Sequence, residues 1–134
     1  MTVVAYVPER QALRGRTMAD AIRAEGRLPV GQVRRIGLQL LDALEAAHAT
    51  GVVHGNVQPG AVQLFADDRA VLLLTAEGGA AEPTRTGDLL SLGATLFAAV
   101  AGRPGPLRPA IDALMNPPDQ GGFDQVRAAL HQAA

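Results

Sequence analysis

The chain contains no cysteine and no lysine, and its aromatic residues are one tyrosine and three phenylalanines. The lack of cysteine excludes disulfides and thiolate metal sites, and it is compatible with a reducing compartment such as the cytoplasm. All twelve basic residues are arginine, so no lysine ammonium group can contact a nucleotide phosphate. With so few aromatic residues, any core is expected to consist mainly of Ala, Val and Leu.

Charge and hydropathy give no sign of a nucleic-acid or membrane partner. The net charge is −1 and the arginines are scattered along the sequence, which predicts no electrostatic footprint for nucleic acid or for an anionic membrane. The longest apolar run, residues 89–101, is shorter than the roughly 18 residues that a spanning helix needs. The first residues lack a basic stretch before an apolar one, so no signal peptide is expected. A length of 134 residues suits one domain with a modest core.

The first apolar run, Thr2–Val7, predicts a short strand that ends before Pro8. A single strand is unstable in water, so it is expected to pair with a partner chain or with a second copy. The predicted interaction residues are its apolar side chains, namely Val3, Val4, Tyr6 and Val7. Residues 9–16 are polar and are expected to form a loop.

Helical periodicity dominates the next part of the chain. Thr17 is expected to open a helix that Gly26 stops, and a longer helix should follow and end before Gly51. Its apolar residues recur at three- and four-residue spacing: Val33, Ile36, Leu40, Leu41, Leu44 and Ala47. Two apolar runs, 62–65 and 70–74, predict a β-hairpin, and shorter helices are expected over 109–115 and 123–131.

The segment between the long helix and the hairpin, Gly51–Leu64, reads GVVHGNVQPGAVQL. It resembles the catalytic loop of protein kinases, in which His-Arg-Asp is followed by a Lys-Pro-x-Asn run. The resemblance implies that Asn56 replaces the aspartate that accepts the substrate proton, Gln58 the phosphate-contacting lysine, and Ala61 the metal-binding asparagine. A neutral amide cannot accept a proton as a carboxylate does, and a methyl group cannot bind Mg²⁺.

Two residues of this segment match the kinase pattern, and both are expected to be structural. His54 and Pro59 should preserve the shape of the loop. His48 and His54 lie six positions apart without a third nearby ligand, so a zinc site is not expected.

A second kinase-like segment begins at Asp88 and extends to residue 106. Its Asp88, Ser91, Leu92 and Gly93 are similar to a pattern in the buried helix F of the kinase C-terminal lobe. By this resemblance Asp88 bonds backbone amides of the catalytic loop; the alternative is a plain helix N-cap. The helix is apolar nearly all round, which predicts that it forms the core.

The connection between these two segments departs further from the kinase pattern. Where kinases carry Asp-Phe-Gly, this chain has Thr75-Ala76-Glu77 or, shifted by one, Ala76-Glu77-Gly78. Glu77 is more simply an exposed loop residue than a metal ligand. Residues 78–87 are few compared with a kinase activation segment, and Thr84 and Thr86 within them are possible phosphorylation sites. Gln120 occupies the position of an arginine that pairs with this segment in kinases.

Together these features predict a mainly α domain, similar to a kinase C-terminal lobe with a small β-hairpin and essentially no N-terminal lobe. The expected parts are a hinge-like strand (1–8), helices (17–50), a degenerate loop with the hairpin (51–75) and a helical core (87–134). The chain resembles the C-terminal lobe of a bacterial, actinobacterial-type Ser/Thr kinase that has become a pseudokinase.

The function expected from this resemblance is a non-catalytic, cytoplasmic scaffold or regulator in bacterial Ser/Thr-kinase signalling. Neither cofactor, metal nor catalytic residue is expected, and the degenerate positions are Asn56, Gln58, Ala61 and Thr75. The expected partner is a protein or a second copy, bound at the edge of the N-terminal strand, with no nucleic acid and no membrane insertion. The alternative is a nucleotide-binding sensor, or part of a Ser/Thr kinase that needs a complementary N-terminal lobe.

Overall fold

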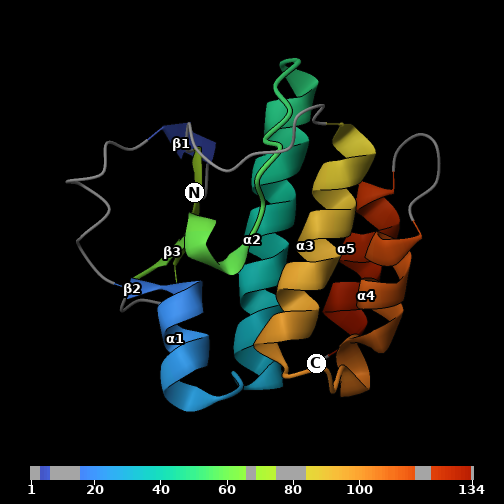
Figure 1. The fold of residues 1–134 in the computed structure, drawn as a ribbon. Coiled ribbons are helices and arrows are strands. Elements are labelled where there is room, and N and C mark those ends of the chain that lie inside the picture. Colours follow the sequence, from blue (N-terminus) through green and yellow to red (C-terminus); the bar gives the residue numbers. More distant parts are fainter. Residues whose placement is uncertain (1–3, 7–15, 66–68, 75–83, 117–121, 134) are drawn as a thin grey trace.

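A computed structural model describes residues 4–6, 16–65, 69–74, 84–116 and 122–133. Helices dominate, as the sequence predicts, and they surround one small sheet (Figure 1). The strands are β1 (Val4–Tyr6), β2 (Arg16–Thr17), β3 (Val62–Leu64) and β4 (Ala70–Leu74). The α-helices are α1 (Met18–Glu25), α2 (Val30–Ala49), α3 (Arg85–Ala99), α4 (Arg108–Met115) and α5 (Phe123–Gln132). Two short 3₁₀ turns, η2 (Pro59–Ala61) and η3 (Gly105–Leu107), precede β3 and α4.

The sheet has the strand order β1-β4-β3-β2. β3 and β4 pair antiparallel, so the predicted hairpin is confirmed. β1 runs parallel to β4, with Val4 opposite Leu72. The expectation that this strand needs an outside partner is therefore wrong. A parallel pair needs a long crossover, and the chain between β1 and β4 supplies one.

The predicted loop over 9–16 is also wrong at its end, because Arg16 and Thr17 form β2.

α1 starts where the sequence predicts because Thr17 caps it. The Thr17 hydroxyl accepts from the amide of Asp20, and the Asp20 carboxylate accepts from the amide of Thr17. This reciprocal pair satisfies two amides that would lack partners at a helix start. Gly26, at φ +79°, then ends the helix in a conformation that other residues rarely adopt.

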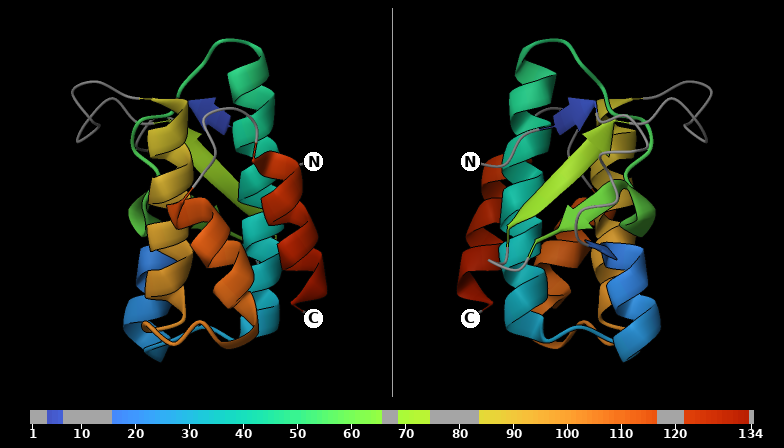
Figure 2. Two further views of the ribbon diagram at one scale, coloured as in Figure 1. Left: turned by 90° about the vertical axis from the view of Figure 1, so that its right-hand side faces the viewer. Right: turned by 90° about the vertical axis from the view of Figure 1, so that its left-hand side faces the viewer.

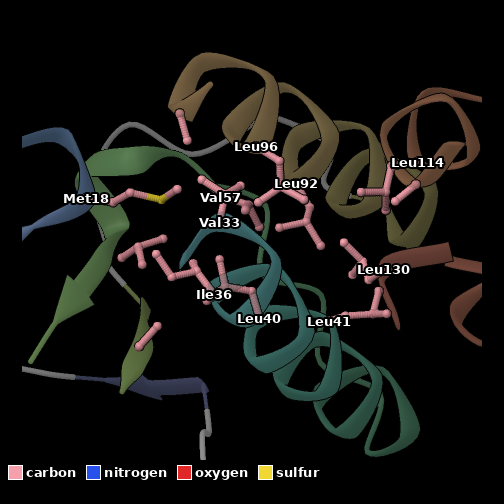
Figure 3. Close-up of a cluster of buried hydrophobic side chains, with 14 of the residues drawn as sticks. Met18, Val33, Ile36, Leu40, Leu41, Val57, Leu92, Leu96, Leu114 and Leu130 are labelled. Atoms are coloured by element: carbon pink, nitrogen blue, oxygen red, sulfur yellow. The ribbon is translucent and has the colours of Figure 1, made fainter. Parts of the chain in front are cut away.

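α2 lies at the centre of the molecule. It packs against β4 on one side and against α3 and α5 on the other (Figures 1 and 2). Its predicted apolar stripe meets Leu92 and Leu96 of α3 and Met18 of α1 in the core (Figure 3). The core residues of α2 are Val33, Ile36, Leu40, Leu41 and Leu44.

An exposed polar cluster also joins α2 to α5. Arg127 of α5 donates to Asp42 at 2.9 Å and to Glu45 at 2.6 Å, both on α2. It also donates to Asp124 of its own helix at 2.9 Å. The hydrogen bond that Arg127 donates to Asp42 raises the pKa of Arg127, and Glu45 adds to that effect. We call this cluster the Arg127 junction.

α3 begins three residues before Asp88, because Thr84 is its N-cap. The Thr84 hydroxyl accepts from the amide of Gly87 at 2.8 Å. The alternative in which Asp88 caps this helix is thus wrong. Gly93 allows α3 to approach α4 closely, since a Cβ there would lie 3.0 Å from the Cβ of Leu114. This contact explains why a glycine at position 93 supports the fold.

Candidate functional site: the loop between α2 and β3

The kinase-like loop connects the end of α2 to the start of β3. Gly51 and Gly55 both have positive φ, +83° and +80°. Gly55 occupies the position at which the kinase pattern has arginine, and its left-handed backbone favours glycine. The loop then enters η2 at Pro59, whose ring suits the first position of a helical turn.

Asp88 of α3 holds the backbone of this loop. Its Oδ2 accepts from the amide of His54 at 2.9 Å, and its Oδ1 accepts from the amide of Gly55 at 2.8 Å. The carboxylate is 1% exposed. This is the arrangement that the kinase resemblance implies for Asp88. A buried carboxylate needs such donors, because removing it from water without partners is costly.

The ring of His54 is fixed at both nitrogens. Its Nδ1 accepts from the amide of Asn56 at 3.0 Å, which leaves the proton on Nε2. Nε2 donates to the carbonyl of Leu73 in β4 at 2.6 Å. His54 is buried and joins the loop to the sheet, which is the structural role expected of it.

His48 is a member of this site that the sequence interpretation missed. Its Nε2 donates to Oδ2 of Asp88 at 2.8 Å, and its ring meets Phe123 of α5 edge to face. Arg85 donates to the carbonyl of His48 at 3.2 Å. A signal was present, because His48 follows Leu44 by four residues and continues the buried stripe of α2. We call Asp88, His48, His54 and the amide of Gly55 the Asp88 junction.

The three substituted kinase positions lie in different surroundings. Asn56 is half-buried, and its Oδ1 accepts from Nε2 of the exposed Gln58 at 2.9 Å. Ala61 is buried, with 2% of its surface exposed. The outward polar groups of the loop at these positions are therefore two amides, which donate and accept hydrogen bonds without carrying charge.

The remaining predicted residues are only partly described. Thr84 and Thr86 are both exposed at the start of α3. Val4 and Tyr6 form β1 as backbone. Val3, Val7, Thr75, Glu77 and Gln120 lie outside the described residues.

Within the described ranges, no three His, Asp or Glu side chains gather closely enough to hold a metal ion. The helices of these same ranges include none that is long and apolar enough to cross a bilayer.

Comparison with known proteins agrees with this geometry. The chain is 33% identical to the serine/threonine-protein kinase PknK of Mycobacterium tuberculosis over 111 aligned residues, covering 64% of this chain. It is 40% identical over 45 residues to a probable serine/threonine-protein kinase of Clostridium perfringens, covering 34% of this chain. The matches span only 10% and 7% of these relatives. No model of a known protein family matches the chain.

The fold itself matches a solved kinase. The crystal structure of Rad53 in complex with AMP-PNP superposes with a TM-score of 0.62 at 19% identity, covering 90% of this chain and 44% of that one. The chain is protein-kinase-like. The described elements of this kinase-like chain are those of a C-terminal lobe, which confirms the predicted fold class.

The same comparisons correct one expectation. We expected the chain not to be an enzyme, on the strength of Asn56, Gln58 and Ala61. That expectation is wrong by this comparison, because the curated proteins that match are named as Ser/Thr protein kinases, which are enzymes. Three substitutions in one loop do not by themselves establish loss of activity.

Proposed function

We propose that this kinase-like chain is a protein-interaction module, acting as a scaffold or regulator in bacterial Ser/Thr-kinase signalling in the cytoplasm. Partner binding and phosphoryl transfer are separate activities, and the proposal concerns the first. The observation that carries it is the position of β1 at one edge of the sheet.

An edge strand offers backbone hydrogen-bonding groups to another chain. β1 pairs with β4 on one side, and no described strand covers its other side. A partner strand, or β1 of a second copy, can add to the sheet there by the same backbone bonds that join β1 to β4. The partner is thus expected to supply an extended segment.

Exposed apolar side chains support a binding role. Among the described residues the large exposed ones are Val52, Leu90, Phe97 and Met115. Leu90 and Phe97 lie seven positions apart on α3, so they share one face of that helix. Covering this surface would remove apolar area from water and would favour association.

Light scattering over micromolar concentrations tests the edge. We expect either a dimer or, with the native partner, a complex that Ala5→Pro weakens, because proline removes an amide from the strand. Ala24→Gly on the exposed face of α1 serves as the control for a backbone change away from this edge. A monomer at all concentrations, with no partner recovered from the native host, contradicts the proposal.

Phosphorylation at the start of α3 is the proposed means of regulation. Thr84 and Thr86 are exposed, so a kinase acting in trans can reach their hydroxyl groups. Because Thr84 also caps α3, a change to alanine combines two effects. Thr84→Asn keeps a capping side chain and removes the phosphorylation site. We expect partner binding to change when Thr84→Asn and Thr86→Ala are combined; unchanged binding contradicts this role.

A second function is favoured by the comparisons, since the relatives are kinases. In it the chain binds nucleotide, or supplies the C-terminal lobe of a Ser/Thr kinase together with a complementary N-terminal lobe. A thermal-shift titration with ATP and Mg²⁺ separates the two functions, because a ligand that binds the native state raises its melting temperature. A rise with phosphate release supports the second function, and no rise with intact partner binding supports the first.

A further inference from the structure

The fold gathers arginines that are scattered in the sequence. The end of α1, the turn after it, the start of α2, the turn after α3 and the start of α4 all lie at the lower end of the molecule (Figures 1 and 2). The amide of Leu28 donates to the carbonyl of Ala99 at 2.8 Å, which ties the first of these turns to the end of α3. η3 packs against both α2 and α4. These contacts bring residues 23–35 and 100–108 to one end of the molecule.

This end of the molecule is strongly basic. Residues 23–35 and 100–108 contain six of the twelve arginines but only one acidic residue, Glu25. We call the six the arginine pole: Arg23, Arg27, Arg34, Arg35, Arg103 and Arg108. Residues 23–35 and 100–108 together carry a net +5, so the remainder of a chain of net charge −1 carries −6. The whole-chain charge therefore conceals a marked asymmetry.

Most of this charge is not neutralised within the chain. Glu25 pairs with Arg16 at 3.3 Å, and Arg23 pairs with Asp20 at 3.2 Å. In the part of the chain that the structure describes, no ion pair is formed by Arg27, Arg34, Arg103 or Arg108. Arg27, Arg103 and Arg108 are exposed. Like charges on one surface repel one another, so a bound anion would relieve a cost that the free protein carries.

The start of α2 adds to the positive potential. This 20-residue helix has no side-chain cap at Pro29 and no acidic residue in its first turn. α1, by contrast, has both. Unsatisfied amides at a helix start carry partial positive charge. They supplement the guanidinium groups and do not by themselves make a site.

We propose that the arginine pole binds a short acidic segment of a partner protein. A guanidinium group can donate two parallel hydrogen bonds to one carboxylate. This bidentate contact combines charge attraction with a fixed orientation. The contact is short in range, because charge is screened over about 8 Å at physiological salt. A short segment can therefore meet the unpaired arginines of the pole without meeting most of the negative remainder of the chain.

Two other anionic partners fit this surface less well. A bilayer or a nucleic-acid duplex is extended, so it would also face the acidic remainder. Membrane insertion uses exposed apolar side chains, and single-stranded nucleic acid uses aromatic ones. None of the large exposed apolar residues, Val52, Leu90, Phe97 and Met115, belongs to residues 23–35 or 100–108. The pole offers charge alone, which suits an acidic peptide.

The arginine pole is independent of the proposed edge-strand interaction. β1 lies toward the opposite end of the molecule in Figure 1. Loss of binding at one surface therefore leaves the other open to measurement.

Fluorescence anisotropy with a labelled peptide of consecutive glutamates tests the proposal on the full chain. We expect binding that weakens as salt is raised. Changing Arg27, Arg103 and Arg108 together to glutamine should weaken it about tenfold, since each exposed charge contact contributes modestly. Arg85→Gln removes the same kind of charge at the opposite end of α3 and should leave the affinity nearly unchanged, whereas the triple variant loses about twofold per arginine. Thermal melting of each variant checks that the fold is retained.

Several outcomes overturn the proposal. One is the absence of peptide binding at low salt, and another is a loss in Arg85→Gln as large as the loss per arginine in the triple variant, which would indicate a response to net charge only. Tighter binding to single-stranded DNA, or to vesicles that contain phosphatidylserine, would assign the pole to a different class of partner. Selective loss in the triple variant, with retained melting temperature and preference for the glutamate peptide, supports it.

Discussion

Two polar junctions bind α2 to its neighbours, and they differ mainly in their access to water. The Asp88 junction is buried, with Asp88 1% and His48 6% exposed, and it holds the backbone of the kinase-like loop. The Arg127 junction lies at the surface, where Asp124 is 99% and Asp42 61% exposed. In both, one side chain meets several partners. Water can replace the partners of Arg127 but not those of Asp88, so the same kind of contact should differ severalfold in its effect on stability.

Breaking the buried junction should have the largest effect. Asp88→Ala leaves the amides of His54 and Gly55 and the ring of His48 without their acceptor. We expect the free energy of unfolding to fall by about 3–5 kcal/mol, as for other broken buried pairs. Urea denaturation measures this change. The matched control is Asp112→Ala on the exposed face of α4, expected to cost less than about 0.5 kcal/mol. Equal losses in the two variants would contradict the comparison.

Breaking the surface junction should cost less and depend on salt. Arg127→Gln is expected to lower the free energy of unfolding by about 1.5 kcal/mol at low ionic strength. The loss should shrink in 1 M salt, because exposed charges are then screened within about 3 Å. Asp88→Ala should show little such dependence. Arg108→Gln, which removes no ion pair, is the control. A salt-independent loss in Arg127→Gln would mean that packing, not charge, holds α5.

The cap of α3 separates the role of Thr84 from that of Asp88. Thr84→Ala removes the hydroxyl that accepts from the amide of Gly87, and we expect a loss of about 1 kcal/mol. Thr84→Asn should retain most of the stability, since asparagine caps well. Thermal unfolding followed by circular dichroism measures both variants. If Thr84→Ala has no effect, then Asp88 alone secures the start of this helix.

The smallest effect is expected at Asp20, whose interactions lie at the surface. The bond from the amide of Thr17 holds the pKa of Asp20 below its ordinary value, and Arg23 adds to this. A carboxyl with a lowered pKa stabilises the fold above its unfolded pKa, and that contribution is lost as the pH falls through the folded pKa. Asp20→Asn should therefore lower the melting temperature slightly near neutral pH and reduce its acid dependence. An unchanged acid slope would show that Asp20 contributes nothing measurable.

The local structure of this chain could be predicted from sequence, and the long-range contacts could not. The stripe of α2 and the hairpin over 62–74 are periodic patterns, so their existence and type follow from neighbouring residues. The pairing of β1 with β4 is not visible in the pattern of 4–6, because an extended apolar run does not specify its partner. The resemblance to kinases did specify one long-range contact, between Asp88 and the amides of the loop.

The candidate site shows the same division. His54 and Asp88 can be identified because they match a motif. His48 lies outside that motif, and its place on the buried stripe of α2 indicates only that it belongs to a helix. The arginine pole was missed for a related reason. The arginines are scattered along the sequence, and the segments that carry Arg27 and Arg103 come together only when Leu28 bonds to Ala99.

The parallel pairing of β1 with β4 also affects the order in which the chain is able to fold. β1 is made among the first residues in this sequence, but its partner follows only after α1, α2 and β3 have been synthesised. Until Leu72 leaves the ribosome, the strand that pairs with Val4 in the described structure has not yet been made. During translation the nascent chain therefore exposes a free strand while its central helix is already able to form, and that interval is when chaperones, or another chain, have the best opportunity to bind it.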